Sequence, residues 1–253
     1  MRGFKIFLPT LPEQQKIAAF LTVLDTRLQQ LQRKKALLEQ YKKGLMQQIF
    51  SRKIRFRDEE GKEFGAWEEK PFETIATFSK GKGIAKSDIS ENGNLECIRY
   101  GELYTHYGEV ISEIQSRTNL DSKDLILSDF NDVIIPSSGE TQLDIAKASC
   151  VLKKGVALGG DLNIIKTKMD GVFLSFYLNN VKKLEIASLA QGNSVVHLYP
   201  SQLKTLMIEF PVLPEQQKIA TFLTALDTKI AHVTTQITLT QTFKKGLLQQ
   251  MFV

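Results

Sequence analysis

Apolar residues recur with a seven-residue period over two long stretches of the chain, residues 11–50 and 213–253. Within each period the apolar columns alternate at spacings of four and three, the heptad pattern of helices that wind around each other. Pro12 and Pro214 suit the first turn of a helix, where a missing N–H costs nothing. The pattern predicts two long helices, each about 60 Å at about 1.5 Å per residue, that pair as an antiparallel coiled coil.

The seam of this predicted coiled coil is mostly aliphatic. Its residues are Ile17, Leu21, Leu24, Leu28, Leu31, Leu38, Leu45, Ile219, Leu223, Leu226, Ile230, Val233, Ile237 and Leu247. Lys35, Lys42, Thr240 and Lys244 interrupt it. Polar residues in such a seam usually select register and orientation at some cost in stability. The less favoured interpretation is two unrelated amphipathic helices packed on a core.

The two stretches are copies of one another. Residues 11–50 and 213–252 match at 22 of 40 positions without a gap, and 14 of these identities fall in the first 16. A repeat this clear predicts two halves of a pseudo-symmetric object. The intervening unit, residues 51–212, occurs once.

Residues 51–212 show a different pattern of apolar and polar positions. Residues 51–70 form a polar, charge-alternating linker. Short β-branched runs bounded by Gly, Asn, Asp or Pro then predict strands. These runs lie at residues 95–101, 131–139, 150–158, 162–168 and 203–210, and residues 173–191 have helical spacing that breaks near 179–180. The chain is therefore predicted to be α+β, with one mixed α/β domain and two long helices.

Charge is spread unevenly over the 253 residues, whose net charge is +5. Residues 1–50 carry +6 and residues 213–253 carry +2, whereas residues 71–212 carry −3. A basic excess permits a nucleic-acid partner, but the acidic middle means that binding must rest on local patches or on a second protein. Two cysteines, Cys97 and Cys150, are too few for a disulfide framework and are expected to be core thiols of a reduced, cytoplasmic protein with no membrane partner.

No catalytic or metal-binding pattern is present in the sequence. The segment GKGIAKS at residues 81–87 lacks the spacing of a phosphate-cradling loop. His106, His197 and His232 are far apart and lack the spacing of metal ligands. We therefore expect no cofactor, no metal and no catalysis.

The repeated motif LPEQQKIAxFLTxLDT, which runs into a long helix ending KKGLxQQxF, resembles the specificity (S) subunit of type I restriction–modification systems. Five segments of the middle resemble a target-recognition domain of that family: residues 80–89, 97–111, 131–141, 159–166 and 192–199. The usual family order is domain, helix, domain, helix. Here the first domain is missing, and residues 1–10 look like a remnant of its last strand.

The resemblance implies a non-enzymatic subunit that reads one half of a bipartite DNA target while its helical pair sets the half-site spacing. It implies docking of methyltransferase (M) subunits on the helices and, through them, of restriction (R) subunits. Methylation and cleavage would belong to those partners. We expect a homodimer that mimics a complete S subunit. The alternative is a truncated half that pairs with another S fragment or does not read DNA.

Three groups of residues are candidate contacts to double-stranded DNA. Lysines among glycines can neutralise phosphates, arginine can bond guanine, and Gln or Asn can bond adenine. The blander interpretations are a solvated basic loop, half-buried aromatics and turn residues that bond their own backbone. The candidates are Lys80, Lys82, Lys86, Arg99, Tyr104, Thr105, His106, Tyr107, Ser138, Thr141, Gln142 and Asn193.

Overall fold

The computed structural model describes residues 9–192 and 195–251, so the predicted remnant strand lies almost wholly outside the described residues. The chain divides into two compact units. Unit 1 comprises Met1–Leu45 and Leu223–Val253, and unit 2 comprises Met46–Phe222. Within the described ranges, no helix is long and apolar enough to cross a bilayer.

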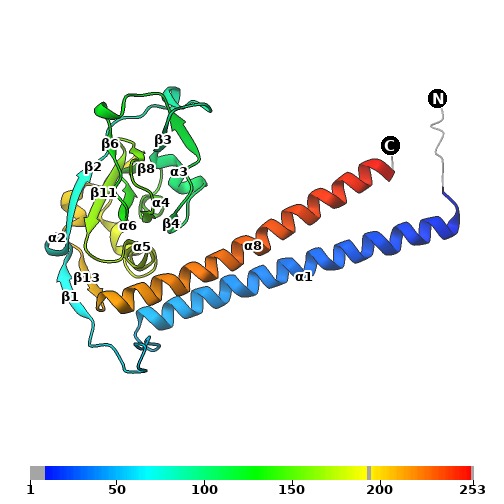
Figure 1. Ribbon diagram of the computed structural model, residues 1–253, viewed down its shortest axis with the longest axis horizontal. Helices are drawn as coiled ribbons and strands as arrows, with labels where there is room; N and C mark the ends of the chain where they lie inside the picture. Colours follow the sequence, from blue (N-terminus) through cyan, green and yellow to red (C-terminus); the bar gives the residue numbers. More distant parts are fainter. Residues whose placement is uncertain (1–8, 193–194, 252–253) are drawn as a thin grey trace. The chain divides into compact units, whose positions relative to one another are not determined.

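Two long helices, α1 (Leu11–Phe50) and α8 (Leu213–Met251), confirm the helices expected from the heptads (Figure 1). Unit 1 contains most of both, whereas residues 46–50 of α1 and 213–222 of α8 belong to unit 2. Lys42 of α1 donates to Asp227 of α8 at 2.6 Å, and Lys244 of α8 donates to Asp25 of α1. From Asp25 to Lys42 along α1, the partner changes from Lys244 to Asp227, which lies nearer the N-terminus of α8. Between these pairs the helices therefore run in opposite directions.

The two ion pairs are the same interaction seen twice. Asp25 and Asp227 occupy equivalent positions in the two copies of the repeat, and so do Lys42 and Lys244. The repeat thus gives unit 1 a local pseudo-two-fold axis. Both lysines were predicted to interrupt the seam, and each is held there by a carboxylate of the other helix. All fourteen predicted seam side chains are buried or half-buried.

Unit 2 is a mixed domain of short strands and helices. Its strands are β1 (Glu68–Pro71), β2 (Ala76–Lys80), β3 (Leu95–Ile98), β4 (Val110–Ile111), β5 (Ser116–Thr118), β6 (Ile126–Leu127), β7 (Asp132–Pro136), β8 (Ser138–Gly139), β9 (Ser149–Val151), β10 (Ala157–Leu158), β11 (Leu162–Thr167), β12 (Val196–His197) and β13 (Met207–Phe210). Its helices are α2 (Phe72–Ile75), α3 (Tyr100–Thr105), α4 (Gln142–Ile145), α5 (Gly171–Asn180), α6 (Lys183–Leu189) and α7 (Pro200–Leu203), with 3-10 turns η1 (Lys86–Asp88) and η2 (Ser122–Asp124). Every predicted run contains at least one of these strands.

Two sheets organise unit 2. One has five strands in the order β2-β11-β7-β9-β4, and the other has four in the order β5-β3-β10-β6. Strand β7 is buried along its whole length, so its side chains do not alternate between buried and exposed. Two further antiparallel pairs, β1 with β13 and β12 with β8, join segments that are far apart in the sequence.

Helix α5 fills the core beside the five-stranded sheet and contacts β7 and β9. It is buried from Gly171 to Leu178, and it ends at Asn180, where the sequence pattern predicted a break. Phe173 at its start meets the rings of Phe50, Trp67 and Tyr177 with centroids 5.8–6.1 Å apart. Aromatic contacts of this kind add to the free energy of burial.

The predicted linker is anchored to the first turns of α8. Arg55 donates twice to the Glu215 carboxylate, both at 2.7 Å, and the Glu215 side chain is only 1% exposed. Phe56 packs edge-on against Phe222 at 5.6 Å. The segment before β1 is therefore part of the folded unit, and alternating charges alone gave no sign of it.

Candidate nucleic-acid interface

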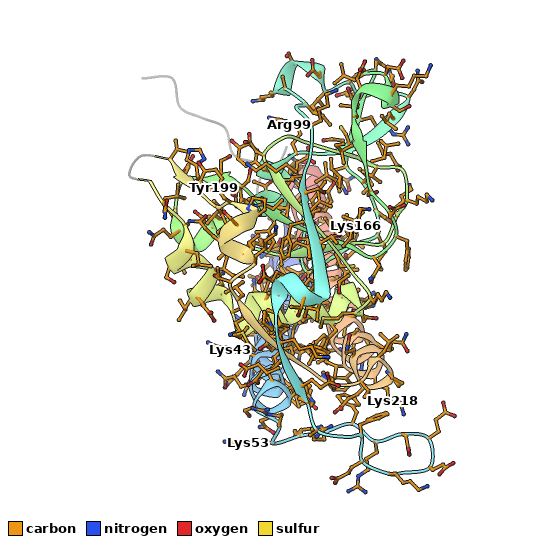
Figure 2. All side chains as sticks on the ribbon, turned by 90° about the vertical axis from the view of Figure 1, so that its left-hand side faces the viewer. Lys43, Lys53, Arg99, Lys166, Tyr199 and Lys218 are labelled. Atoms are coloured by element: carbon orange, nitrogen blue, oxygen red, sulfur yellow. The ribbon has the colours of Figure 1, made fainter. Side chains whose placement is uncertain are left out.

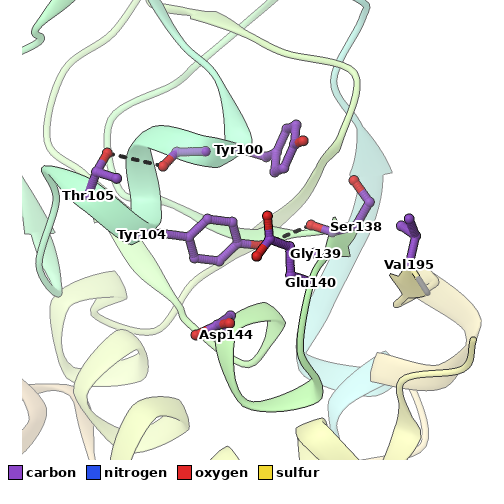
Figure 3. A pocket seen from close by; sticks show the side chains of 9 residues that line it. Tyr100, Tyr104, Thr105, Ser138, Gly139, Glu140, Asp144 and Val195 are labelled. Atoms are coloured by element: carbon purple, nitrogen blue, oxygen red, sulfur yellow. Dashed lines mark hydrogen bonds between the residues drawn. The ribbon is translucent and has the colours of Figure 1, made fainter. Parts of the chain in front are cut away.

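Three segments of unit 2 meet around a cavity of about 540 Å³ (Figure 3). Helix α3 supplies one wall, and the segment from β8 into α4 supplies the other. The lining residues are Tyr100, Gly101, Tyr104, Thr105, Ser138, Gly139, Glu140, Asp144 and Val195. Three predicted DNA contacts, Tyr104, Thr105 and Ser138, are thus brought together.

A second cavity, of about 530 Å³, shares Tyr100 with the first. Arg99 lines it together with the segments before η1 and after β10, which contribute residues 83–85 and 159–161. The two cavities therefore adjoin at Tyr100. Arg99 and Tyr199 lie at the end of unit 2 opposite Lys53 and Lys218 (Figure 2).

Arg99 is positioned through its backbone, which leaves its guanidinium available. Its N–H donates to the Glu102 carboxylate at 3.2 Å at the start of α3, and that carboxylate also accepts from Ser116 Oγ at 2.6 Å. In the part of the chain that the structure describes, the guanidinium makes no hydrogen bond or ion pair within the protein. A half-exposed arginine held in this way can bond the edge of a guanine.

Tyr104 and Tyr107 serve the fold. The Tyr104 hydroxyl donates to the Ser138 carbonyl at 2.8 Å, and burial raises the pKa of this hydroxyl above its usual value. Tyr107 is 7% exposed, packs in the core, and accepts the Gln115 N–H at 2.9 Å. Burial raises the pKa of Tyr107 to about 12. The Tyr107 ring is therefore not on the exposed surface, whereas the Tyr104 ring forms part of the cavity wall.

The predicted basic loop keeps its three lysines exposed. The Lys80 ammonium lies 5.2 Å from the centre of the Tyr199 ring, and Lys82 lies 4.0 Å from Asp124. Gly81 is required by packing, because a Cβ there would lie 2.1 Å from the Gly159 carbonyl oxygen. The backbone at Gly81 therefore lies against the end of β10 and the residue that follows it.

The remaining candidates differ in the hydrogen bonds that their side chains make within the protein. Thr105 bonds the ring of His106 at 2.6 Å, and both are exposed. Thr141 caps α4 by accepting the Asp144 N–H, which is the turn-residue interpretation. Gln142 is exposed and donates to the Ala190 carbonyl at 3.4 Å. Lys86 lies in η1, and Asn193 lies outside the described residues.

Acidic groups around the cavities were not among the predicted residues. Glu140 and Asp144 line the first cavity and Asp161 lines the second. The only sequence signal was the net charge of −3 over residues 71–212. Carboxylates can accept from the amino group of cytosine, but they weaken attraction to phosphates.

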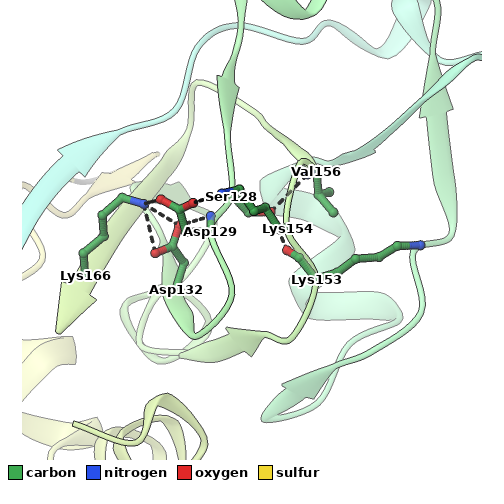
Figure 4. Close-up of polar contacts among 7 residues, drawn as sticks. All are labelled: Ser128, Asp129, Asp132, Lys153, Lys154, Val156 and Lys166. Carbon is green, nitrogen blue, oxygen red and sulfur yellow. Dashed lines mark hydrogen bonds and ion pairs between the residues drawn. The ribbon is translucent and has the colours of Figure 1, made fainter. Parts of the chain in front are cut away.

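Lys166, which lies in one of the segments resembling a recognition domain, is occupied by an ion-pair cluster (Figure 4). Its ammonium contacts Asp129 at 2.6 Å and Asp132 at 3.0 Å. Desolvation raises the pKa of Asp132, although hydrogen bonds from the Asp129 N–H and from Lys166 act in the opposite direction. Lys166 therefore supports the loop between β6 and β7.

The cysteines behave as core thiols. Cys97 and Cys150 are free and buried, and burial raises the pKa of Cys97 to about 11. Among the described residues, no group of three or more His, Cys, Asp or Glu side chains is arranged to hold a metal ion.

A family model described as "Type I restriction modification DNA specificity domain" matches residues 65–241. Two similar proteins from Methanocaldococcus jannaschii are the putative type I restriction enzyme MjaX specificity subunit and the type I restriction enzyme MjaVIII specificity subunit. Each is 26% identical, over 233 and 248 residues, and each alignment covers 90% of this chain. The alignments cover 53% and 56% of the relatives, so the chain spans about half their length.

Two solved structures share the fold. The HsdS subunit from Thermoanaerobacter tengcongensis matches with a TM-score of 0.55 at 16% identity, covering 97% of this chain and 59% of that one. A chain from a structure titled for complex assembly and conformational transition of the type I R-M system matches with a TM-score of 0.58 at 17% identity, covering 97% and 60%. Both matches extend over almost the whole chain, including its long helices.

Proposed function

Because the chain belongs to the type I restriction–modification DNA specificity family, we propose that it reads one half of a bipartite DNA target and delegates methylation and cleavage to partner subunits. The observation that carries this proposal is the pair of adjoining cavities that share Tyr100. They gather the Arg99 guanidinium, the hydroxyl groups of tyrosine, threonine and serine, and the carboxylates of Glu140, Asp144 and Asp161. Side chains of these kinds around adjoining cavities can bond the edges of bases.

The likeness to specificity subunits also supports docking of methyltransferase subunits on α1 and α8, and through them of restriction subunits. We propose that the two helices form an antiparallel coiled coil whose length sets the half-site spacing. The reciprocal ion pairs Lys42–Asp227 and Asp25–Lys244 support one defined register.

DNA binding by the chain alone is expected to be weak. The acidic residues near the cavities oppose the phosphates, and neutralisation of phosphates usually supplies much of the affinity. At ~150 mM salt we expect micromolar or weaker binding, with methyltransferase subunits supplying the backbone contacts. Nanomolar binding by the purified chain would contradict this division of labour.

The proposal includes a homodimer that mimics a complete S subunit, with pairing to a separately encoded S fragment as its rival. In a two-fold dimer each domain would read the same half-site, so the target would be palindromic. Light scattering at micromolar concentration separates the two: a monomeric mass removes the homodimer.

Selection of bound sequences from random duplexes, with the chain assembled on its methyltransferase subunit, tests the reading function. We expect a consensus in two parts. Arg99→Gln should relax one position by about 1–3 kcal/mol, whereas Lys82→Gln should weaken all sequences alike. Enrichment of no consensus would favour a fragment that occupies methyltransferase subunits without reading DNA.

A further inference from the structure

Two side chains of opposite charge line the second cavity of unit 2, whose volume is about 530 Å³. One is Arg99, and the other is Asp161, which lies in the turn between β10 and β11. Among the residues that the structure describes, neither side chain makes a hydrogen bond or an ion pair, with the other or with the rest of the protein. The cavity therefore offers a cationic donor and an anionic acceptor that the fold itself does not use.

The backbone holds both residues in place. The Gly159 N–H donates to the Ile98 carbonyl at 2.9 Å, which ties the turn that carries Asp161 to the residue before Arg99. The Ser137 N–H donates to the Asp161 carbonyl at 2.8 Å. A backbone fixed in this way leaves only side-chain rotations to be ordered when a ligand binds, and this lowers the entropic cost of binding.

One base pair presents the hydrogen-bonding groups that Arg99 and Asp161 together require. A guanidinium bonds best to two adjacent acceptors, and a carboxylate needs a donor. In the major groove a G·C pair shows two acceptors, guanine N7 and O6, followed by one donor, the cytosine N4 amino group. An A·T pair shows an acceptor, a donor and an acceptor, so it does not supply two adjacent acceptors to the arginine.

The carboxylate also argues against a phosphate as the ligand of this cavity. An arginine by itself bonds phosphate oxygens as readily as base edges. A phosphate between Arg99 and Asp161 would lie against a second negative charge, which opposes binding. A base edge carries no net charge, and a cytosine amino group supplies the proton that the carboxylate needs.

We infer that this cavity contacts one G·C pair of the DNA half-site, with Arg99 bonding the guanine and Asp161 bonding the amino group of the paired cytosine. This inference rests on the proposed function and names the base pair that the site reads. It makes Asp161 a specificity-determining residue. A base pair that turned an oxygen toward this carboxylate would bring two acceptors together without a proton, so Asp161 rejects thymine as well as accepting cytosine.

The test selects bound sequences from random duplexes, with the chain assembled on its methyltransferase subunit, and then alters single atoms of the selected duplex. We expect a G·C pair in the consensus that relaxes in Arg99→Met, which keeps the length of the side chain without its charge. Replacing that guanine by 7-deazaguanine, which lacks N7, should weaken wild-type binding about tenfold and leave Arg99→Met almost unchanged. Replacing the paired cytosine by 2-pyrimidinone, which lacks the amino group, should weaken wild-type binding about as much and leave Asp161→Ala almost unchanged.

Matched controls separate base reading from folding. Glu113 is exposed and lines neither cavity, so Glu113→Ala should keep the full sensitivity to both analogues. Gly83 lines the cavity, and a Cβ there meets nothing within 4 Å, so Gly83→Leu should lower affinity severalfold at an unchanged melting temperature. Gly108 has the same open space but lines neither cavity, so Gly108→Leu should bind as the wild type does.

The outcomes separate this inference from the proposed function. If no consensus is enriched, the reading function fails and the inference fails with it. If a consensus is enriched but Arg99→Met relaxes no G·C position, the proposed function stands and the inference is wrong. Equal weakening of all sequences by Arg99→Met would identify a phosphate contact and overturn it. Equal sensitivity of the wild type and Asp161→Ala to 2-pyrimidinone would remove Asp161 from the contact and overturn it as well.

Discussion

The first turns of the two repeats have nearly the same sequence and opposite surroundings. Residues 11–18 and 213–220 both read LPEQQKIA. In the second copy, Glu215, Gln216, Ile219 and Ala220 are all buried, with Ile219 at 0% exposed. In the first copy the equivalent residues are exposed, except for a half-buried Ile17. Identical local chemistry therefore leads to different burial.

One interaction is common to both copies because it is local. The Gln14 amide donates to the Pro9 carbonyl at 2.8 Å, and the Gln216 amide donates to the Pro211 carbonyl at 2.7 Å, five residues back in each case. Among the residues that the structure describes, only Gln216 also accepts a distant donor, the Asp170 N–H at 2.9 Å. The repeat thus encodes the start of each helix, and the neighbouring domain supplies the rest.

The largest expected effect comes from removing Arg55, which pairs with Glu215 of the second copy. Arg55→Ala leaves the Glu215 carboxylate buried without its partner, so we expect a loss of about 3–5 kcal/mol from the stability of unit 2. Urea unfolding followed by the fluorescence of Trp67, which packs on Phe173 in unit 2, measures it. Arg57→Ala breaks only an exposed pair with Glu63 and should cost less than about 1 kcal/mol. Equal losses would mean that Glu215 is solvated.

The same isoleucine can be shortened in both copies. Ile219→Ala should cost about 2–5 kcal/mol, because the side chain is fully buried and its removal leaves a cavity. Ile17→Ala should cost less than about 1 kcal/mol, because Ile17 is half-buried. Urea unfolding by circular dichroism and fluorescence compares them. A similar cost at Ile17 would show that its end of α1 is covered in solution.

The glutamines give a smaller contrast. Gln216→Ala removes the acceptor of the Asp170 N–H and should cost about 1–3 kcal/mol. Gln14→Ala should fall within about 0.5 kcal/mol of the parent, since Gln14 is exposed. Hydrogen exchange offers a direct check, because only Gln216→Ala should accelerate exchange of the Asp170 amide. Unchanged exchange there would place the stabilising contact elsewhere.

The smallest expected effect is one in which the two copies should behave alike. Gly44→Ala and Gly246→Ala should each stabilise the helices by up to about 1 kcal/mol, because alanine has the higher helix propensity and its Cβ meets nothing. Thermal unfolding by circular dichroism measures both. Gly81→Ala is the opposite control, since its Cβ would collide with the Gly159 carbonyl and should lower the melting temperature.

Residue chemistry nominated the candidate DNA contacts, but it did not show which of these side chains are free to bind. Arg99 and Thr105 line the two cavities, and their contact with DNA stays a prediction. Tyr107 has the same chemistry as Tyr104, yet its ring packs in the core. The bond from Tyr104 to Ser138 spans 34 residues, and Lys166 meets acidic residues more than 30 positions away. Periodicity reports neighbours three or four positions away and carries no information about such contacts.

The heptad period and the repeat predicted the two long helices and their equivalence, because each depends on spacings within a few turns. Tertiary structure decided which copy of LPEQQKIA is buried, how β1 reaches β13, and which polar groups remain open around Tyr100. The physical reason is that tertiary packing, and not the local sequence of a segment, sets how far its side chains are buried. A residue's solvent exposure depends on what the distant chain places against it.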